Sequence, residues 1–275
     1  MITTPLSVDH ALSARLELAD AQLHVLGHDA VAKHLPERPR ALLRLAGGVA
    51  SYVGPRISLS RAVGLGMSGP VAATDLDALV DFYAQRREVA RVLVSPYADP
   101  TLLEGLGERG FRLSDLGTTL ARRLDPADRV EPLSAGITVR RMEAHERATW
   151  VHTSLAGFSG TDDNVPGEMS ATFEAVTHVP TTTYYFATID GVLAGAGAVD
   201  VQSGAAYFFA TSTLPGARRR GVQSALLRAR LAAAIACGCD LAFTQTVAGS
   251  PSQRNAERHG FATIYSRARL IRPFA

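Results

Sequence analysis

Three consecutive arginines and a glycine stand where a β-rich segment leads into a helical one. Arg218, Arg219 and Arg220 are followed by Gly221, and apolar residues recur at helical spacing over residues 222–237. A helix N-terminus carries unpaired N–H groups and a partial positive charge, so it attracts anions. Glycine permits close backbone approach, and arginine adds charge-assisted hydrogen bonds to phosphate. We therefore predict a phosphate- or diphosphate-binding loop rather than a solvated basic turn.

This loop resembles the acetyl-CoA motif of the GNAT (N-acetyltransferase) superfamily, R/Q-x-x-G-x-G/A between a strand and a long helix. Arg218 takes the first position, Gly221 the second and Gln223 the last, where the family has a small residue. The resemblance covers about residues 137–275 and implies acetyl-CoA as co-substrate, on a mixed, splayed sheet. It also implies the following cofactor-binding residues: Thr211, Ser212, Thr213, Arg218, Arg219, Arg220, Gly221, Val222, Gln223, Ser224, Ser252 and Asn255.

The chemistry that the resemblance implies is direct attack of an amine on the acetyl thioester. Such attack needs donors for the oxyanion and an acid for the departing thiolate. The family pattern implies that backbone amides near Ser212 and Thr213 serve the oxyanion. The tyrosine that many members carry four residues before a Gly-Phe pair is Ala256 here. Tyr265 and Ser252 are the candidate replacements, although Tyr265 also fits an ordinary strand position and Ser252 a helix start.

Candidate bases lie in and after the polar loop that follows residue 156. Asp162, Asp163 and Glu168 are carboxylates in a segment of the kind that borders an acceptor site, although aspartates also form ordinary turns. A water relay would make a base unnecessary. Trp150 and Phe158 either belong to the core, which we favour, or line an acceptor cleft.

Two groups of potential metal ligands are incomplete. Cys237 and Cys239 are spaced C-x-C with no histidine close in sequence. His24 and His28 form an i, i+4 pair beside Asp29 without a further ligand. We predict no metal site.

The composition is that of a globular chain with a packed core. Its 275 residues are 47% hydrophobic and 20% charged, with a formal net charge of +2, and we find no basic stripe with interleaved aromatics. No uninterrupted apolar run reaches about 18 residues, and no signal peptide pattern opens the chain. We expect a cytoplasmic monomer or homodimer that binds neither nucleic acid nor membrane.

The local patterns of the second half predict an alternation of strands and helices. Asp190-Gly191 indicates a hairpin, and Ser250 followed by Pro251 indicates a capped helix start. We expect strands at 137–141, 183–189, 192–201, 205–213 and 241–247 with a last β pair to Ile271, and helices at 143–156, 168–178, 222–237 and 251–259.

The two halves repeat one another at a fixed offset. Phe111 matches Phe261, which gives 261 − 111 = 150, and at the same offset Leu76 matches Leu226. We therefore expect an α/β fold (an α+β mixed sheet) of two GNAT-like domains, at residues 1–128 and 137–275, joined by a linker at 129–136.

The repeat fails at the arginine loop. RRRGVQSAL in the second half corresponds to SGPVAATDL in the first, which has no arginine. There Thr74 is a candidate helix cap, and Asp75 and Asp77 bring negative charge to the first turn, where they would repel phosphate. We predict a degenerate N-terminal domain and one cofactor per chain.

The favoured function is N-acetyl transfer from acetyl-CoA to an amine of a small molecule or peptide. The alternative is a catalytically weak acyl-CoA-binding or regulatory protein. A purely structural scaffold is disfavoured, because it has no reason to keep the charge in one copy only.

Overall fold

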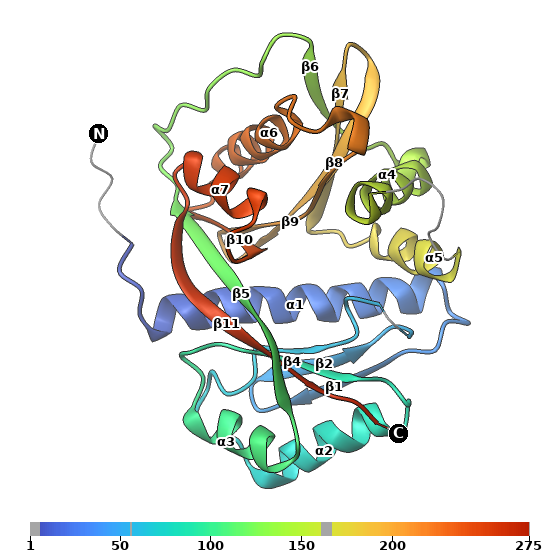
Figure 1. Cartoon of the computed structure of the whole chain (residues 1–275), viewed down its shortest axis with the longest axis vertical. Helices are drawn as coiled ribbons and strands as arrows, with labels where there is room; N and C mark the ends of the chain where they lie inside the picture. The colour runs from blue at the N-terminus through green and yellow to red at the C-terminus, as the bar shows by residue number, and fades with distance from the viewer. Residues whose placement is uncertain (1–5, 56, 161–166, 275) are drawn as a thin grey trace. The chain divides into compact units, whose positions relative to one another are not determined.

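The computed structural model describes residues 6–55, 57–160 and 167–274, and the chain divides into two compact units (Figure 1). Unit 1 comprises Met1–Thr119, Thr246–Ala248 and Ile264–Ala275, and unit 2 comprises Leu120–Gln245 and Gly249–Thr263. Unit 2 differs from the expected second domain, residues 137–275, at its N-terminal and C-terminal boundaries. The C-terminal segment belongs to unit 1, and the expected linker belongs to unit 2.

Unit 1 is a sheet with helices on both faces. Its strands follow the order β1-β2-β3-β4-β11-β5, and β11 pairs antiparallel with β4 from Ala268↔Val94 to Arg272↔Ala90. One apolar cluster lies between α1 and the sheet, and another includes residues of α2 and α3. Its elements are α1 (His10–His34), β1 (Ala41–Leu45), β2 (Gly48–Tyr52), β3 (Ala62–Val63), α2 (Ala73–Ala84), β4 (Ala90–Val94), α3 (Pro100–Glu108), most of β5 (Arg112–Arg123) and most of β11 (Ala262–Arg272).

Unit 2 is a sheet of order β6-β7-β8-β9-β10-β5, to which β5 contributes its last residues. The strands β6 to β9 are antiparallel neighbours, whereas β9 and β10 are parallel. Its elements are β6 (Ile137–Arg141), a 3₁₀ turn (Ala144–Glu146), α4 (Arg147–Ser159), α5 (Gly167–Val176), β7 (Thr182–Ile189), β8 (Val192–Gln202), β9 (Ala205–Thr213), a 3₁₀ turn (Pro215–Ala217), α6 (Val222–Ala236), β10 (Leu241–Val247) and α7 (Pro251–Arg258).

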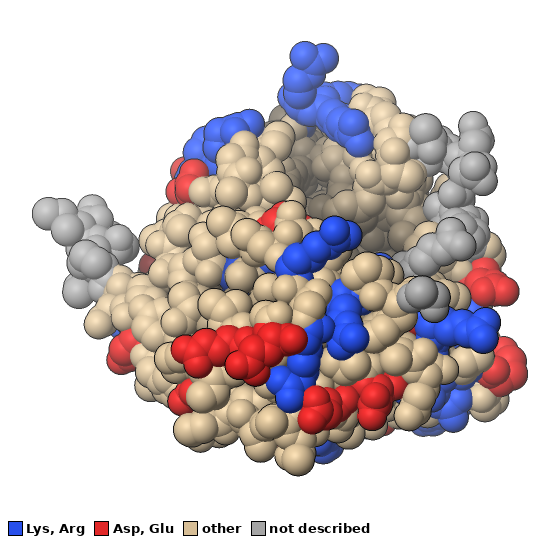
Figure 2. Space-filling model, turned by 60° about the horizontal axis from the view of Figure 1, so that its bottom comes forward, with Lys and Arg blue, Asp and Glu red and all other residues tan. Residues whose placement is uncertain are grey.

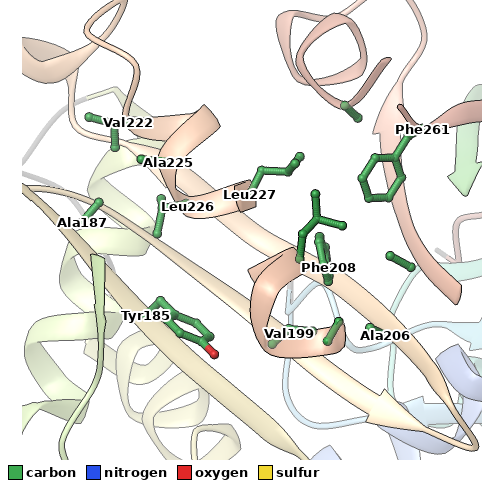
Figure 3. Close-up of a cluster of buried hydrophobic side chains, with 14 of the residues drawn as sticks. Tyr185, Ala187, Val199, Ala206, Phe208, Val222, Ala225, Leu226, Leu227 and Phe261 are labelled. Atoms are coloured by element: carbon green, nitrogen blue, oxygen red, sulfur yellow. The ribbon is translucent and has the colours of Figure 1, made fainter. Parts of the chain in front are cut away.

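The alternation of side chains along β7 separates the two apolar layers of unit 2. Tyr184 and Phe186 pack with Trp150 of α4, and the Trp150 indole N–H donates to the Tyr185 carbonyl at 3.1 Å. Tyr185 and Ala187 belong to the opposite layer, with α6. Figure 3 shows this second layer, in which Val222, Leu226 and Leu227 of α6 lie over strand residues and Phe261. Helix α6 is thus fixed on the sheet along its length.

Most of the predicted elements of the second half are confirmed, several with their predicted bounds. The hairpin turn lies at Asp190 and Gly191, both with positive φ, as the Asp-Gly pair predicts. Ser250 caps α7 by accepting from the Gln253 N–H at 3.1 Å. The predicted helix from residue 143 is preceded by a 3₁₀ turn, because Glu143 and Glu146 form a capping box there. The predicted last β pair is wrong, since β11 is one continuous strand.

The offset of 150 residues recurs in the structure. Strand β5 begins at Arg112 and β11 at Ala262, and α2, β4 and α3 correspond in the same order to α6, β10 and α7. Phe111 and Phe261 are both buried, each after a glycine of positive φ. The two halves are therefore copies of one arrangement.

The loop of the first copy is filled by its own side chains. Leu65 and Met67 are buried between β3 and α2. The N-cap of α2 is Ala72, so the predicted cap at Thr74 is wrong: the helix begins one residue before it. Asp75 lies in the first turn as predicted, and Asp77 accepts a hydrogen bond from Arg109 at 2.7 Å. This loop therefore has buried apolar side chains and acidic residues where the second copy has arginines.

A buried ionic cluster ties β11 to α1 within unit 1. Arg267 donates to Glu17 at 2.7 Å and to Asp20 at 2.9 Å, and Tyr265 donates to Glu17 at 2.9 Å. All four side chains are buried. Because an unpaired charge at this depth is costly, each partner depends on the others. The C-terminal strand is thus an integral part of unit 1.

His24 lies beside this cluster as a neutral side chain. The Nδ1 atom is 3.1 Å from the Leu59 carbonyl oxygen, and Arg61 donates to Nε2 at 3.2 Å. Burial lowers the pKa of His24 to about 4, and the Arg61 charge acts in the same direction, whereas Asp20 opposes it. Protonation of His24 therefore destabilises the folded state.

The His24→Gln variant should lose part of the acid sensitivity of the wild-type protein. The folded pKa lies below the unfolded value of about 6.5, so the unfolded state binds the proton first. Wild-type stability should fall as the pH drops from about 6.5 towards 4, by on the order of 3 kcal/mol in full. Urea unfolding at pH 7 and pH 5 measures this loss, and an equal loss in His24→Gln would contradict the assignment.

Candidate functional site

The end of β9 leaves the hydrogen-bond ladder with β10. Parallel pairing joins residues 205–208 to residues 241–244, and in the described part of the chain no β9–β10 pair extends past Phe208. On its other side β9 stays paired with β8 as far as Thr213↔Gly195. The register shifts between Ala196 and Ala198 of β8, opposite Ala210, which has a φ of +47°. Strand β9 therefore ends in a bulged segment with one unpaired edge.

The loop after β9 places an uncapped helix end next to this segment. Arg219 and Gly221 have positive φ, and Gly221 is the N-cap of α6 without a side-chain cap hydrogen bond. The backbone bond from Ala225 N to Gly221 O, 3.0 Å long, begins the helical ladder. The N–H groups of residues 222–224 therefore have no acceptor within the helix. The free N–H groups and the three arginines thus lie on one short segment, residues 218–224.

The arginines of the loop differ in what they contact. Arg218 donates from Nη2 to the Gly157 carbonyl at the end of α4, at 3.2 Å. Arg220 lies 4.0 Å from Asp190, and both of these side chains are exposed. An exposed pair of this kind contributes little. Arg219 and Arg220 are therefore accessible to a ligand, whereas Arg218 also fastens the loop to α4.

Helix α4 approaches the end of β9 closely at Gly157. A Cβ atom on residue 157 would lie 2.6 Å from the Cβ and Oγ atoms of Ser212. Ser212 itself is buried, and its Oγ is 3.4 Å from the Thr153 carbonyl oxygen. Only glycine fits this contact, which places the C-terminal end of α4 beside the bulged segment.

Two hydrogen bonds join the first turn of α6 to α7. Gln223 donates from Nε2 to Ser252 Oγ at 3.0 Å, and Ser224 donates to Asn255 Oδ1 at 2.7 Å. The first bond gives a physical reason for glutamine where the related motif has a small residue. Because the Ser252 oxygen accepts from Gln223, its own O–H remains available as a donor.

Asn255 carries a buried donor that has no partner among the described residues. The side chain is 2% exposed, and its Nδ2 atom makes no hydrogen bond. Such a group is costly unless something accepts from it. Asn255 and Ser252 are thus two donors beside the uncapped helix end, and they fit the polar atoms of a bound phosphate ester or amide.

Tyr265 has its hydrogen-bond partner within unit 1, and its role as the general acid stays a prediction. Its hydroxyl donates to Glu17 in unit 1, and its ring lies edge-on to Tyr97 with centroids 6.0 Å apart. Burial raises the pKa of the Tyr265 hydroxyl. Local sequence does not reveal this partner, because β11 joins the sheet of unit 1 by pairing with β4.

The candidate bases are only partly described. Glu168 is an exposed residue in the first turn of α5. Asp162 and Asp163 lie outside the described residues. Trp150 is a core residue, as favoured, whereas the expectation of a core position for Phe158 is wrong, since its side chain is 63% exposed on α4.

Arg230 is a polar residue of unit 2 that the sequence patterns did not single out. It lies on α6 among apolar residues, is 1% exposed, and donates to one backbone carbonyl of α6 and one of β8. Burial lowers the pKa of Arg230 to about 9. A charged residue on the apolar face of a helix was the signal that could have revealed it.

Figure 2 shows acidic and basic side chains interspersed on one face. Among the described residues, no group of three or more histidine, cysteine or acidic side chains could hold a metal ion. No helix in the described ranges has both the length and the apolar character that a membrane span needs.

Comparison with known proteins agrees with this geometry. Residues 148–261 match the model of the Acetyltransferase (GNAT) family. No curated protein shows significant similarity to the chain.

Solved structures resemble almost the whole chain. A GCN5-related N-acetyltransferase from Kribbella flavida has a TM-score of 0.65 at 18% identity, covering 96% of each chain. A tandem GNAT protein from the clavulanic acid biosynthesis pathway has a TM-score of 0.60 at 18% identity, covering 98% of this chain and 96% of its own. A GCN5-related N-acetyltransferase from Sphaerobacter thermophilus has a TM-score of 0.56 at 16% identity, covering 85% of this chain and 76% of its own. The protein therefore has the tandem GNAT fold, and residues 148–261 of its second half match the GNAT acetyltransferase family.

Proposed function

We propose that the protein transfers an acetyl group from acetyl-CoA to an amine of a small molecule or peptide. The observation that carries the proposal is the uncapped N-terminus of α6, which follows the arginine loop and adjoins the unpaired edge of β9. The first feature suits a diphosphate and the second suits an extended amide chain. Coenzyme A contains both.

The diphosphate would accept from the backbone N–H groups of residues 222–224. Arg219 and Arg220 would add charge from the loop, and Gly221 allows the backbone to approach the phosphate. The amides of the pantetheine arm would pair with the free edge of residues 209–213 as an added strand does. Ser252 and the unpaired Asn255 donor stand near enough to the helix start to contact the same ligand.

Acyl transfer then follows from the position of the thioester at the end of β9. The amine nitrogen attacks the carbonyl carbon, the C–N bond forms, and the C–S bond breaks. Backbone N–H groups near Ser212 and Thr213 would stabilise the oxyanion. The thiolate would take its proton from Ser252 or water, and the amine would lose its proton to Glu168 or water. Positioning supplies much of the rate in this scheme.

Removing two loop charges tests the cofactor site. Arg219→Ala combined with Arg220→Ala should weaken acetyl-CoA binding about 10-fold or more, because charge-assisted hydrogen bonds to phosphate are lost. Isothermal calorimetry measures the affinity. Arg123→Ala combined with Arg141→Ala removes the same charge elsewhere in unit 2 and should bind normally. Unchanged affinity in the loop variant would overturn the assignment of the loop.

An amine-dependent release of thiol tests the reaction. The wild-type protein incubated with acetyl-CoA and a pooled amine library should release free coenzyme A only when amines are present. Mass spectrometry should identify the acetylated amine. A protein that only binds the cofactor would bind acetyl-CoA in calorimetry and release no thiol with any amine pool, and this result would favour a regulatory role.

Tyr265→Phe should keep the activity of the wild-type protein and lower its stability. The variant removes a buried hydrogen bond to a carboxylate, which costs about 1–3 kcal/mol. Urea unfolding measures the stability, and the thiol assay measures kcat. A large loss of kcat at unchanged stability would instead support Tyr265 as the general acid.

A further inference from the structure

Arg230 is buried in unit 2 without a carboxylate. Its side chain is 1% exposed, and no ion pair joins it to an acidic residue in the described part of the chain. Its ring neighbour is Phe208, whose centroid lies 4.9 Å from the guanidinium carbon. Burial of an unpaired cation is expensive, and an apolar residue at this position of α6 would avoid the cost. Its presence therefore calls for a specific reason.

The hydrogen bonds of Arg230 all go to backbone carbonyls. Nε donates to Leu226 O at 2.9 Å on the same helix, and Nη1 donates to Ala198 O of β8 at 2.9 Å. The same Nη1 makes a longer contact of 3.4 Å with Phe209 O of β9. Ala198 and Phe209 are register partners. The guanidinium thus bridges two strands from the face that α6 covers.

The bridged pair is the pair next to the β9 bulge. Between Ala198↔Phe209 and Ala196↔Ser212, β9 contains one more residue than β8, and Ala210 adopts a positive φ. A bulge interrupts the ladder and leaves backbone groups in need of partners. A planar fork of N–H donors suits two adjacent carbonyls that a regular strand pair would not present.

The strand opposite the bulge is shaped for this side chain. A Cβ atom on Gly197 would lie 3.3 Å from the guanidinium carbon of Arg230. Glycine at 197 therefore leaves the space that the guanidinium occupies. The bulge, the glycine and the buried arginine form one arrangement.

We propose that Arg230 is a positioning residue that holds the β9 bulge, and through it the backbone amides of Ser212 and Thr213, in the geometry that receives the acyl carbonyl. This inference rests on the proposed acyl transfer. It assigns α6 two tasks: its first turn binds the phosphates, and Arg230, two turns later, sets the shape of the strand that faces the thioester.

A purely structural arginine would affect stability alone. Under the proposal, Arg230→Met lowers kcat about 10-fold or more, because the oxyanion donors are no longer held in place. The affinity for coenzyme A without an acetyl group falls less than kcat does, since the phosphate site on the first turn of α6 is intact and only the strand edge at residues 209–213 is loosened. Arg230→Lys, which retains the charge and one donor, recovers part of kcat.

Two further variants provide the controls. Gly197→Ala keeps the arginine and forces its guanidinium to shift by a few tenths of an ångström, so it should lower kcat in the same direction but by less, and it carries the test if Arg230→Met does not fold. Arg228→Met removes a charge from the same helix, where Arg228 donates to the Pro132 carbonyl at 3.0 Å, and should leave kcat unchanged.

Hydrogen exchange tests, independently of turnover, whether Arg230 holds the β9 bulge in place. Amides of residues 210–213 should exchange faster in Arg230→Met and Gly197→Ala, whereas those of β7 should exchange as in the wild type. Unchanged exchange at 210–213 overturns the proposal, and so does a kcat that equals that of the wild type. If the wild-type protein acetylates no amine, the proposed function fails, and the acyl-transfer role of Arg230 is rejected with it. Faster exchange in Arg230→Met would then still show that Arg230 holds the β9 bulge.

Discussion

Backbone groups that leave a sheet ladder must find other partners, and this constraint shapes unit 2 at the end of β9. The strand stops pairing with β10 after Phe208 and bulges at Ala210. On one face Arg230 donates hydrogen bonds to backbone carbonyls at the bulge. On the other, α4 packs so closely that residue 157 must be glycine. The remaining free edge of the strand is what an extended ligand can use.

The duplicated arrangement shows how the same helix start acquires opposite properties. Neither α2 nor α6 has a side-chain cap hydrogen bond at its start, but in unit 2 the loop before α6 bears exposed arginines. In unit 1 the loop before α2 buries Leu65 and Met67, and Asp75 occupies the first turn. The order of helices and strands recurs at an offset of 150 residues, whereas the two loops differ in side chains and in backbone: the positive φ of Gly221 has no counterpart at Val71. A fold of this kind therefore supports one anion site by choice of residues rather than of topology.

Local chemistry explains what could be predicted from the sequence. The Asp190-Gly191 hairpin, the Ser250 cap and the arginine loop each depend on residues close together in the chain, and each pattern has a direct physical cause. The partners of Tyr265 could not be predicted in this way, because Glu17 is 248 residues away along the chain. The position of Arg230 on the apolar face of α6 could have indicated its burial, but its partners lie at a bulge in β9, which the residues of α6 do not reveal.

The two buried arginines, Arg267 in unit 1 and Arg230 in unit 2, differ in a way that matches these roles. Arg267 is neutralised by Glu17 and Asp20, which is the expected way to bury a charge where only packing is at stake. Arg230 is bonded to neutral carbonyls, so its positive charge is not cancelled by a described carboxylate. A carboxylate beneath the end of β9 would repel a developing oxyanion and a departing thiolate, because charges interact strongly in a dry interior. Carbonyl partners hold the strand in shape and leave the local field favourable to negative charge. The same arginine thus satisfies the bulge and suits the chemistry proposed beside it.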